Sequence, residues 1–204
     1  MKKIVLLIVA LSLIAVSPVV YGADTILLGN GNVALKASYL NFTEGALEDL
    51  DNDDALYLGL EAYNKITSNL YVGMEVGYAR TDGSARIVLG EMEPVKADTE
   101  LTFVPIELNL KYALDIAPRL VADMGAGISY SWMKEEISGP GLSSPGDDWL
   151  WGGQIFAALN YKIERFFMGI NAKYQFTENF EIRDFDTDVN ASNWRIGGQI
   201  GIMF

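Results

Sequence analysis

The sequence contains no cysteine and no histidine among its 204 residues. Without cysteine there is no disulfide scaffold and no thiol nucleophile, and without both residue types the usual zinc sites are excluded. The absence of histidine also removes imidazole-based acid–base catalysis, which is the commonest kind. Since many familiar catalytic mechanisms are excluded, function has to be sought in the architecture of the chain.

Positive charge is scarce as well, with 15 Lys and Arg against 27 Asp and Glu and a formal net charge of −12. A chain of this sign repels a phosphate backbone, so we expect no nucleic-acid partner. We also expect no cofactor and no metal site. The acidic run Asp49–Asp53 alternates oxygen ligands, but a calcium loop beginning there would need glycine at its sixth position and glutamate at its twelfth, where the chain has Asp54 and Leu60.

Long apolar runs are confined to the N-terminus. Two lysines precede the segment Ile4–Val16, which is apolar except for Ser12, and Gly22 follows as a small residue. This pattern predicts a secretory signal peptide over residues 1–22 and a mature domain over 23–204. Beyond residue 22 the longest charge-free stretch, Trp149–Tyr161, has only 13 residues. A membrane-spanning helix needs about 20, so none is expected in the mature chain.

The mature chain shows period-two alternation of apolar and polar residues, which predicts strands. The predicted strands are Val33–Phe42, Ala55–Lys65, Leu70–Arg80, Thr99–Tyr112, Leu120–Met133, Trp149–Tyr161, Phe167–Phe176 and Trp194–Phe204. Long connections at 43–54, 81–98, 134–148 and 177–193 alternate with short ones at 66–69, 113–119 and 162–166. We therefore predict an all-β fold, an eight-stranded antiparallel up-and-down transmembrane β-barrel with both termini in the periplasm.

The two faces of these strands differ in charge. One face has 42 positions without an ionisable Asp, Glu, Lys or Arg, as contact with lipid tails requires, and its aromatic residues lie near the strand ends. The other face carries nine glycines, and we count only Leu40, Tyr57, Tyr71 and Phe156 as bulky residues on it. It also holds four acids and four bases, namely Lys36, Glu61, Glu75, Glu107, Lys111, Asp123, Lys173 and Arg195. A soluble barrel of the lipocalin type would instead turn its apolar face inward around a ligand.

The last strand, Trp194–Phe204, alternates apolar residues and ends in a C-terminal aromatic. It resembles the terminal strand that the barrel-assembly machinery reads in Gram-negative bacteria, with Trp194 and Phe204 as the assembly signal. Together with Thr102–Tyr112, a further typical strand, it makes the mature chain resemble the small outer-membrane barrels of the outer membrane protein A, outer membrane protein X and opacity-like type. The resemblance implies insertion in the bacterial outer membrane among lipid and lipopolysaccharide.

The eight lumen-facing charges are open to two interpretations. They can pair and fill a narrow barrel, or their rearrangement can open a narrow ion path. A catalytic role is the remaining alternative. Ser129 and Ser131 share a strand with Asp123, but we interpret them as small lumen residues and expect no enzyme.

Most of the acidity lies in the four long connections, which together hold 19 acidic and 4 basic residues. We interpret them as a solvated rim whose carboxylates lie among the divalent cations that bridge lipopolysaccharide. The segment 81–98 includes apolar residues that either pack against other loops or present a strand edge to an extracellular partner. The predicted function is therefore non-enzymatic envelope structure with surface contacts through acidic loops. The alternative is a narrow channel for small or hydrophobic solutes, similar to outer membrane protein W, which an apolar gate high in the lumen would favour.

Overall fold

Strands and tight turns make up the described part of the computed structural model, which covers residues 28–43, 53–87, 95–139, 142–182 and 185–204. The strands are β1 Gly31–Phe42, β2 Asp54–Lys65, β3 Leu70–Ile87, β4 Val95–Ala117, β5 Leu120–Gly139, β6 Leu142–Ile163, β7 Phe166–Thr177, β8 Asn179–Ile182, β9 Phe185–Asn190 and β10 Asn193–Met203. In these ranges no helix is long and apolar enough to cross a membrane. The predicted signal peptide lies outside the described residues and stays a prediction.

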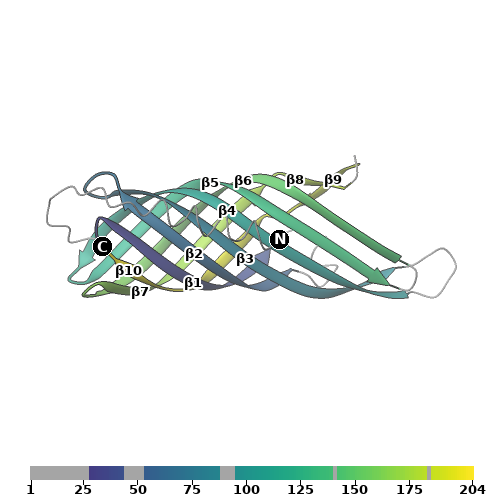
Figure 1. The fold of residues 1–204 in the computed structure, drawn as a ribbon, viewed down its shortest axis with the longest axis horizontal. Coiled ribbons are helices and arrows are strands. Elements are labelled where there is room, and N and C mark those ends of the chain that lie inside the picture. The colour runs from purple at the N-terminus through teal and green to yellow at the C-terminus, as the bar shows by residue number, and fades with distance from the viewer. Residues whose placement is uncertain (1–27, 44–52, 88–94, 140–141, 183–184) are drawn as a thin grey trace.

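Eight of these strands close into an antiparallel barrel in the order β1-β10-β7-β6-β5-β4-β3-β2 (Figure 1). The first and last barrel strands close it, with Asn32 opposite Met203 and Phe42 opposite Asn193. Next to the pair of Asn32 and Met203, the backbone N–H of Gly31 donates to the carbonyl of Phe204 at 2.8 Å. The predicted eight-stranded up-and-down barrel is confirmed. The end of the barrel that holds Gly31, Phe204 and the short connections is called the turn end, and the opposite end the loop end.

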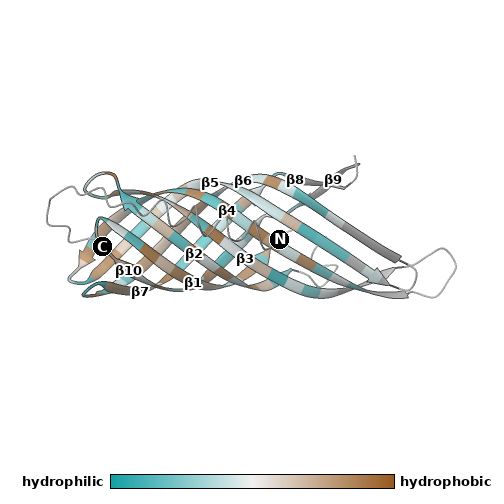
Figure 2. Ribbon diagram, viewed as in Figure 1, coloured by the Kyte–Doolittle hydropathy of each residue, from teal (hydrophilic) through white to brown (hydrophobic). Residues whose placement is uncertain are grey.

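The faces of the strands lie as predicted. Hydrophobic and hydrophilic residues alternate along the barrel strands in Figure 2, and the outward apolar residues are the exposed ones. Ile170 and Ile200, for example, are 66% and 61% exposed, whereas every one of the eight inward charges is at most 7% exposed. A lipocalin-like arrangement, with the apolar face inside, is therefore wrong.

Four neighbouring strands continue well past the loop end of the others. β2 pairs with β3 only as far as Leu56 opposite Arg80, but β3 and β4 stay paired to Ile87 opposite Val95. β5 and β6 likewise remain paired to Gly139 opposite Leu142. We call the part of β3, β4, β5 and β6 beyond this level the extension. The long connections predicted at 81–98 and 134–148 are thus mostly strand, because alternation continues there with polar residues in place of the apolar row. The connection at 177–193 contains the β8–β9 hairpin.

The barrel has more bulky inward residues than the four predicted from the sequence. Tyr63, Phe103 and Phe167 also point inward and are at most 2% exposed. The barrel has room for such rings because a glycine lies opposite several of them. Tyr63 pairs with Gly73 and Phe167 with Gly201, and a Cβ built on either glycine would overlap the ring across from it. Glycine therefore makes space in the narrow lumen for an aromatic ring on the next strand.

These rings belong to two apolar clusters that fill the lumen at different levels. The loop-end cluster consists of Leu40, Phe42, Tyr57, Ala79, Leu101, Phe103, Met133, Leu150 and Ala191. The turn-end cluster consists of Leu28, Ala34, Tyr63, Tyr71, Ala113, Val121 and Phe167, with Phe156 and Met203 packed against it. The buried charges of the lumen are concentrated between these two clusters.

Candidate functional site: the buried charge network of the lumen

Seven strands supply the eight lumen charges, because each has a charged residue at an inward position. β4 contributes two of them, Glu107 and Lys111, while β6 contributes no charged residue at this level. Side chains from opposite walls meet here because an eight-stranded barrel is just wide enough to be filled by its own residues. The structure therefore places all eight predicted residues inside the barrel, in two groups.

The larger group is a continuous network of six residues with Glu75 at its centre. Lys36 Nζ lies 2.5 Å from Glu61 Oε2 and 2.8 Å from Glu75 Oε2. The same Glu75 oxygen accepts from Lys173 Nζ at 2.6 Å. We call these residues, together with two further members, the six-residue network: Lys36, Glu61, Glu75, Glu107, Lys173 and Arg195.

Lys173 continues the six-residue network to Glu107, with which it forms a further ion pair. Arg195 Nη2 donates to the other Glu107 oxygen at 2.7 Å, and its guanidinium lies 4.5 Å from the centre of the Tyr57 ring. Tyr57 in turn donates its hydroxyl to Glu75 Oε1 at 2.6 Å. The network has three acids and three bases. Such balance is needed because a buried ion without a partner costs several kcal/mol, of the order of 3–5 when one member of a pair is removed.

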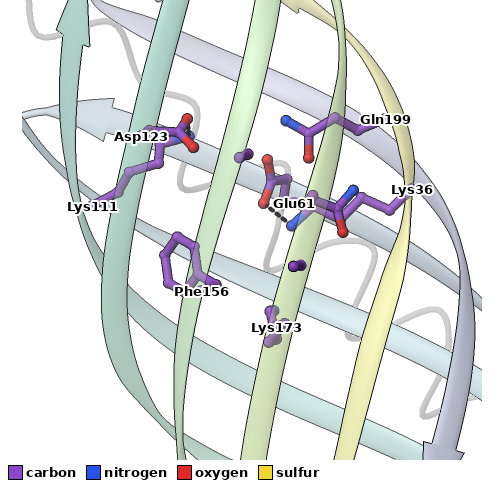
Figure 3. Close-up of a pocket in the computed structure, with 10 residues that line it drawn as sticks. Lys36, Glu61, Lys111, Asp123, Phe156, Lys173 and Gln199 are labelled. Carbon is purple, nitrogen blue, oxygen red and sulfur yellow. Dashed lines mark ion pairs between the residues drawn. The ribbon is translucent and has the colours of Figure 1, made fainter.

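The smaller group is the pair of Lys111 and Asp123, on the neighbouring strands β4 and β5. Lys111 Nζ lies 3.5 Å from Asp123 Oδ2 and only 3.6 Å from the centre of the Tyr63 ring, so the aromatic face shares in stabilising the ammonium. Asn160 donates to the same Asp123 oxygen at 3.1 Å. A polar cavity is lined by members of both groups (Figure 3).

Uncharged polar side chains form a part of the site that the sequence analysis did not identify. Gln175 accepts from Arg195 Nη2 at 2.6 Å and donates its amide to Ser129 and Ser131 at 2.9 and 3.0 Å. On the other side, Gln154 donates to Asn109 Oδ1 at 2.8 Å. Their signal in the sequence is their position, since each occupies an inward site in its strand.

The serines considered as nucleophiles are engaged by the Gln175 amide, which is not a base. Asp123 stands six residues from Ser129 along β5, about 20 Å at roughly 3.4 Å per residue, which is too far for proton transfer between the two. Among the described residues no group of three or more acidic side chains is arranged to hold a metal ion. Most of the acidic run Asp49–Asp53 lies outside these residues.

The predicted assembly residues lie on the last strand and its end. Trp194 faces outward on β10 and its ring centre lies 5.3 Å from that of Tyr39. Phe204 is 43% exposed, and its ring covers Gly31, while its backbone pairs with that residue across the closing seam. The two residues predicted as a signal therefore lie at the two ends of the strand that closes the barrel.

These features define a class of protein: a closed antiparallel barrel with a lipid-facing apolar surface and a polar, filled lumen. The family model for the outer membrane protein beta-barrel domain matches residues 6–197. The chain belongs to this family and is a barrel of the bacterial outer membrane. The predicted location in that membrane is confirmed at this level.

Solved structures with the same fold come from several bacteria. Neisserial surface protein A is 10% identical with a TM-score of 0.60, covering 86% of this chain and 98% of its own. OprG from Pseudomonas aeruginosa is 13% identical with a TM-score of 0.53, covering 89% and 100%. Ail from Yersinia pestis, in complex with the heparin analogue sucrose octasulfate, is 12% identical with a TM-score of 0.51, covering 85% and 99%. At these identities the likeness concerns the fold. A comparison with curated proteins gave no match.

Proposed function

We propose that this protein is a non-enzymatic envelope protein that supports the outer membrane and makes surface contacts through its loop end. The observation that carries the proposal is the extension of β3, β4, β5 and β6 beyond the barrel wall. A lumen filled by ions and aromatic rings fits a structural role for the barrel itself. The acidic loop end is then the part that meets other molecules.

Within the described part of the chain, the extension has an edge that pairs with no other strand and is suited to a partner. Beyond Arg80 the ladder of β3 runs only to β4, so residues 81–87 turn a second row of backbone groups away from the sheet. An exposed edge of this kind can accept a strand from another chain. The opposite edge, on β6, is blocked at its start because Trp151 N–H donates to the Glu178 carboxylate at 2.8 Å. We therefore favour the β3 edge as the contact surface for an extracellular protein.

Charge narrows the class of ligand. Ail binds a heparin analogue in its crystal, but that ligand is a polyanion, and the loop segments of this chain carry 19 acidic and 4 basic residues. Repulsion disfavours a sulfated polysaccharide here. A basic protein surface, or lipopolysaccharide bridged through divalent cations, is the better match.

The proposal includes an orientation. The loop end faces the outside of the cell and the termini face the periplasm, as in other barrels with short turns on the periplasmic side. Assembly through the barrel-assembly machinery, with Trp194 and Phe204 as its signal, belongs to the same proposal. A cysteine placed at Thr67, in a turn, and another at Ser84, in the extension, tests the orientation. Only the second is expected to react with an impermeant thiol reagent on intact cells.

Removal of the extension tip tests the contact function. A variant lacking 84–97 keeps the predicted barrel strands, so we expect it to reach the membrane. We also expect cells carrying it to lose attachment to a surface coated with the extracellular partner. The matched control replaces the same residues with an equally long Gly/Ser segment, which keeps the length but alters the edge and its charge. Attachment retained at the wild-type level by the deletion variant would refute the extension as the contact surface.

A narrow channel for small or hydrophobic solutes is the second candidate, and the loop-end cluster favours it. Phe42 and Phe103 pack edge to face with ring centres 5.5 Å apart and can serve as an apolar gate above the charges. Flux of an apolar dye into liposomes with and without the protein separates the two candidates. If the dye enters liposomes containing the wild type no faster than empty liposomes, and enters faster with Phe103→Ala, the loop-end cluster is a closed plug and the wild type is not a channel.

A further inference from the structure

A cavity of about 10 Å³ lies in the lumen and is lined by members of both charge groups (Figure 3). Its lining includes Lys36 and Glu61 from the six-residue network, and Lys111 and Asp123 from the smaller pair. This volume is close to the lower limit for one water molecule. Nothing larger than a single small molecule or ion fits between the two groups.

Three polar atoms of the lining side chains have no partner in the described protein. They are Asp123 Oδ1, Gln199 Oε1 and Asn171 Nδ2. These residues are 3%, 4% and 8% exposed, so bulk solvent does not satisfy them. An unsatisfied buried polar atom costs about 1–3 kcal/mol, and three of them at one cavity need an explanation.

The other polar atoms of the same side chains are engaged, and this holds the free ones in place. Asp123 Oδ2 accepts from Asn160 at 3.1 Å. Gln199 Nε2 donates to Asn160 Oδ1 at 2.6 Å. Asn171 Oδ1 accepts from Ser38 at 3.5 Å. A rotation that paired one free atom would therefore break a contact that already exists.

The geometry points to one ordered water molecule bound in this cavity. Water can donate to Asp123 Oδ1 and Gln199 Oε1 and accept from Asn171 Nδ2, which matches two acceptors and one donor. A metal cation is a poorer match, because three of the lining residues are lysines (Lys36, Lys111 and Lys173) against two acids. An anion is disfavoured by the two free oxygens.

The water connects β5 to two adjoining strands, β7 and β10, that are not its neighbours in the sheet. Asp123 belongs to β5, Asn171 to β7 and Gln199 to β10, and β6 separates the first of these from the second. The site therefore bridges the lumen from wall to wall. It lies between the two apolar clusters, so exchange with bulk water is expected to be slow compared with that of surface water.

Relaxation dispersion of ¹⁷O water, measured on the refolded full chain in micelles, counts long-lived internal waters. We expect Ala158→Val, which adds methyl groups to a lining residue, to bind one fewer than the wild type. Ala157→Val, whose side chain faces lipid on the same strand, is the matched control and is expected to keep the wild-type count. An equal count in all three proteins would overturn the inference.

A crystal structure of the wild type supplies a test that does not depend on the variant folding. A density peak within about 3.2 Å of the three atoms is expected. Rotated side chains that pair with one another, with no peak between them, would refute the site. Replacing sodium by choline in the dispersion experiment must leave the count unchanged, since a change on sodium removal would mean a bound cation in place of water.

Discussion

The replacement Arg195→Met tests whether the six-residue network stabilises the barrel through pairing. Methionine keeps much of the length and the apolar stem of arginine but removes its charge. Arg195 is 1% exposed, and the change leaves Glu107 with Lys173 as its remaining cation. Removing one partner of a buried pair costs about 3–5 kcal/mol, so we expect a loss of unfolding free energy in that range.

The second member of the pair makes the test quantitative. Glu107→Gln alone is also expected to destabilise, because Arg195 is then left with Glu75 at 3.9 Å as its nearest carboxylate. The double variant removes one acid and one base and restores neutrality. Its loss should therefore be smaller than the sum of the two single losses, by about 1–3 kcal/mol of coupling.

Equilibrium unfolding in urea, followed by tryptophan fluorescence in detergent or vesicles, measures these differences. The control is Arg80→Gln, which breaks the exposed pair of Arg80 with Glu100 at the base of the extension and should change stability little. Strictly additive losses in the double variant, or a loss in Arg195→Met no larger than in the control, would refute the reasoning.

Three further predictions concern packing, lipid contact and pH. Gly77→Val should destabilise by about 1–3 kcal/mol because its side chain would overlap the Tyr57 ring. Gly198→Val should not, because a Cβ there would meet only the Gly169 carbonyl oxygen at 3.7 Å; unfolding midpoints check both. Ile170→Arg places a charge in the lipid-facing row and should lower the free energy of unfolding in vesicles by about 2–4 kcal/mol. An arginine introduced in a turn, outside the bilayer, should lower it little. Burial raises the pKa of the Glu135 carboxyl, so stability of the extension should fall as pH rises through that pKa. Glu135→Gln should abolish the fall in hydrogen-exchange protection, and an unchanged pH profile would contradict this.

The strand pattern allowed the barrel to be predicted because lipid forces one face of each strand to be free of charge. Lys36 and Arg195, far apart in the sequence, could be assigned to the same lumen from their inward positions alone. Their actual partners could not be predicted, because pairing depends on strand stagger around a closed sheet. Lys173, for instance, bonds Glu75 across the lumen and not a residue on an adjoining strand.

The extension was only partly predictable for a related reason. Once β3 and β4 leave the membrane, the apolar row that reveals a strand is no longer required, and residues such as Arg80 and Asp82 take its place. The inward rings were undercounted because inward aromatics were not compared with the residue opposite. The pairing of Tyr63 with Gly73 depends on register, which a single sequence does not provide.

Because only four neighbouring strands are extended, the barrel is asymmetric about its own axis at the loop end. Among the described residues, a four-stranded sheet walls one half of its mouth, and the strands of the other half end lower, apart from the β8–β9 hairpin beside β6 (Figure 1). A molecule that approaches along the cell surface therefore meets the four extended strands from one side and the shorter strands from the other. Neighbouring copies would therefore offer different profiles to a passing ligand according to how each is rotated about its own axis.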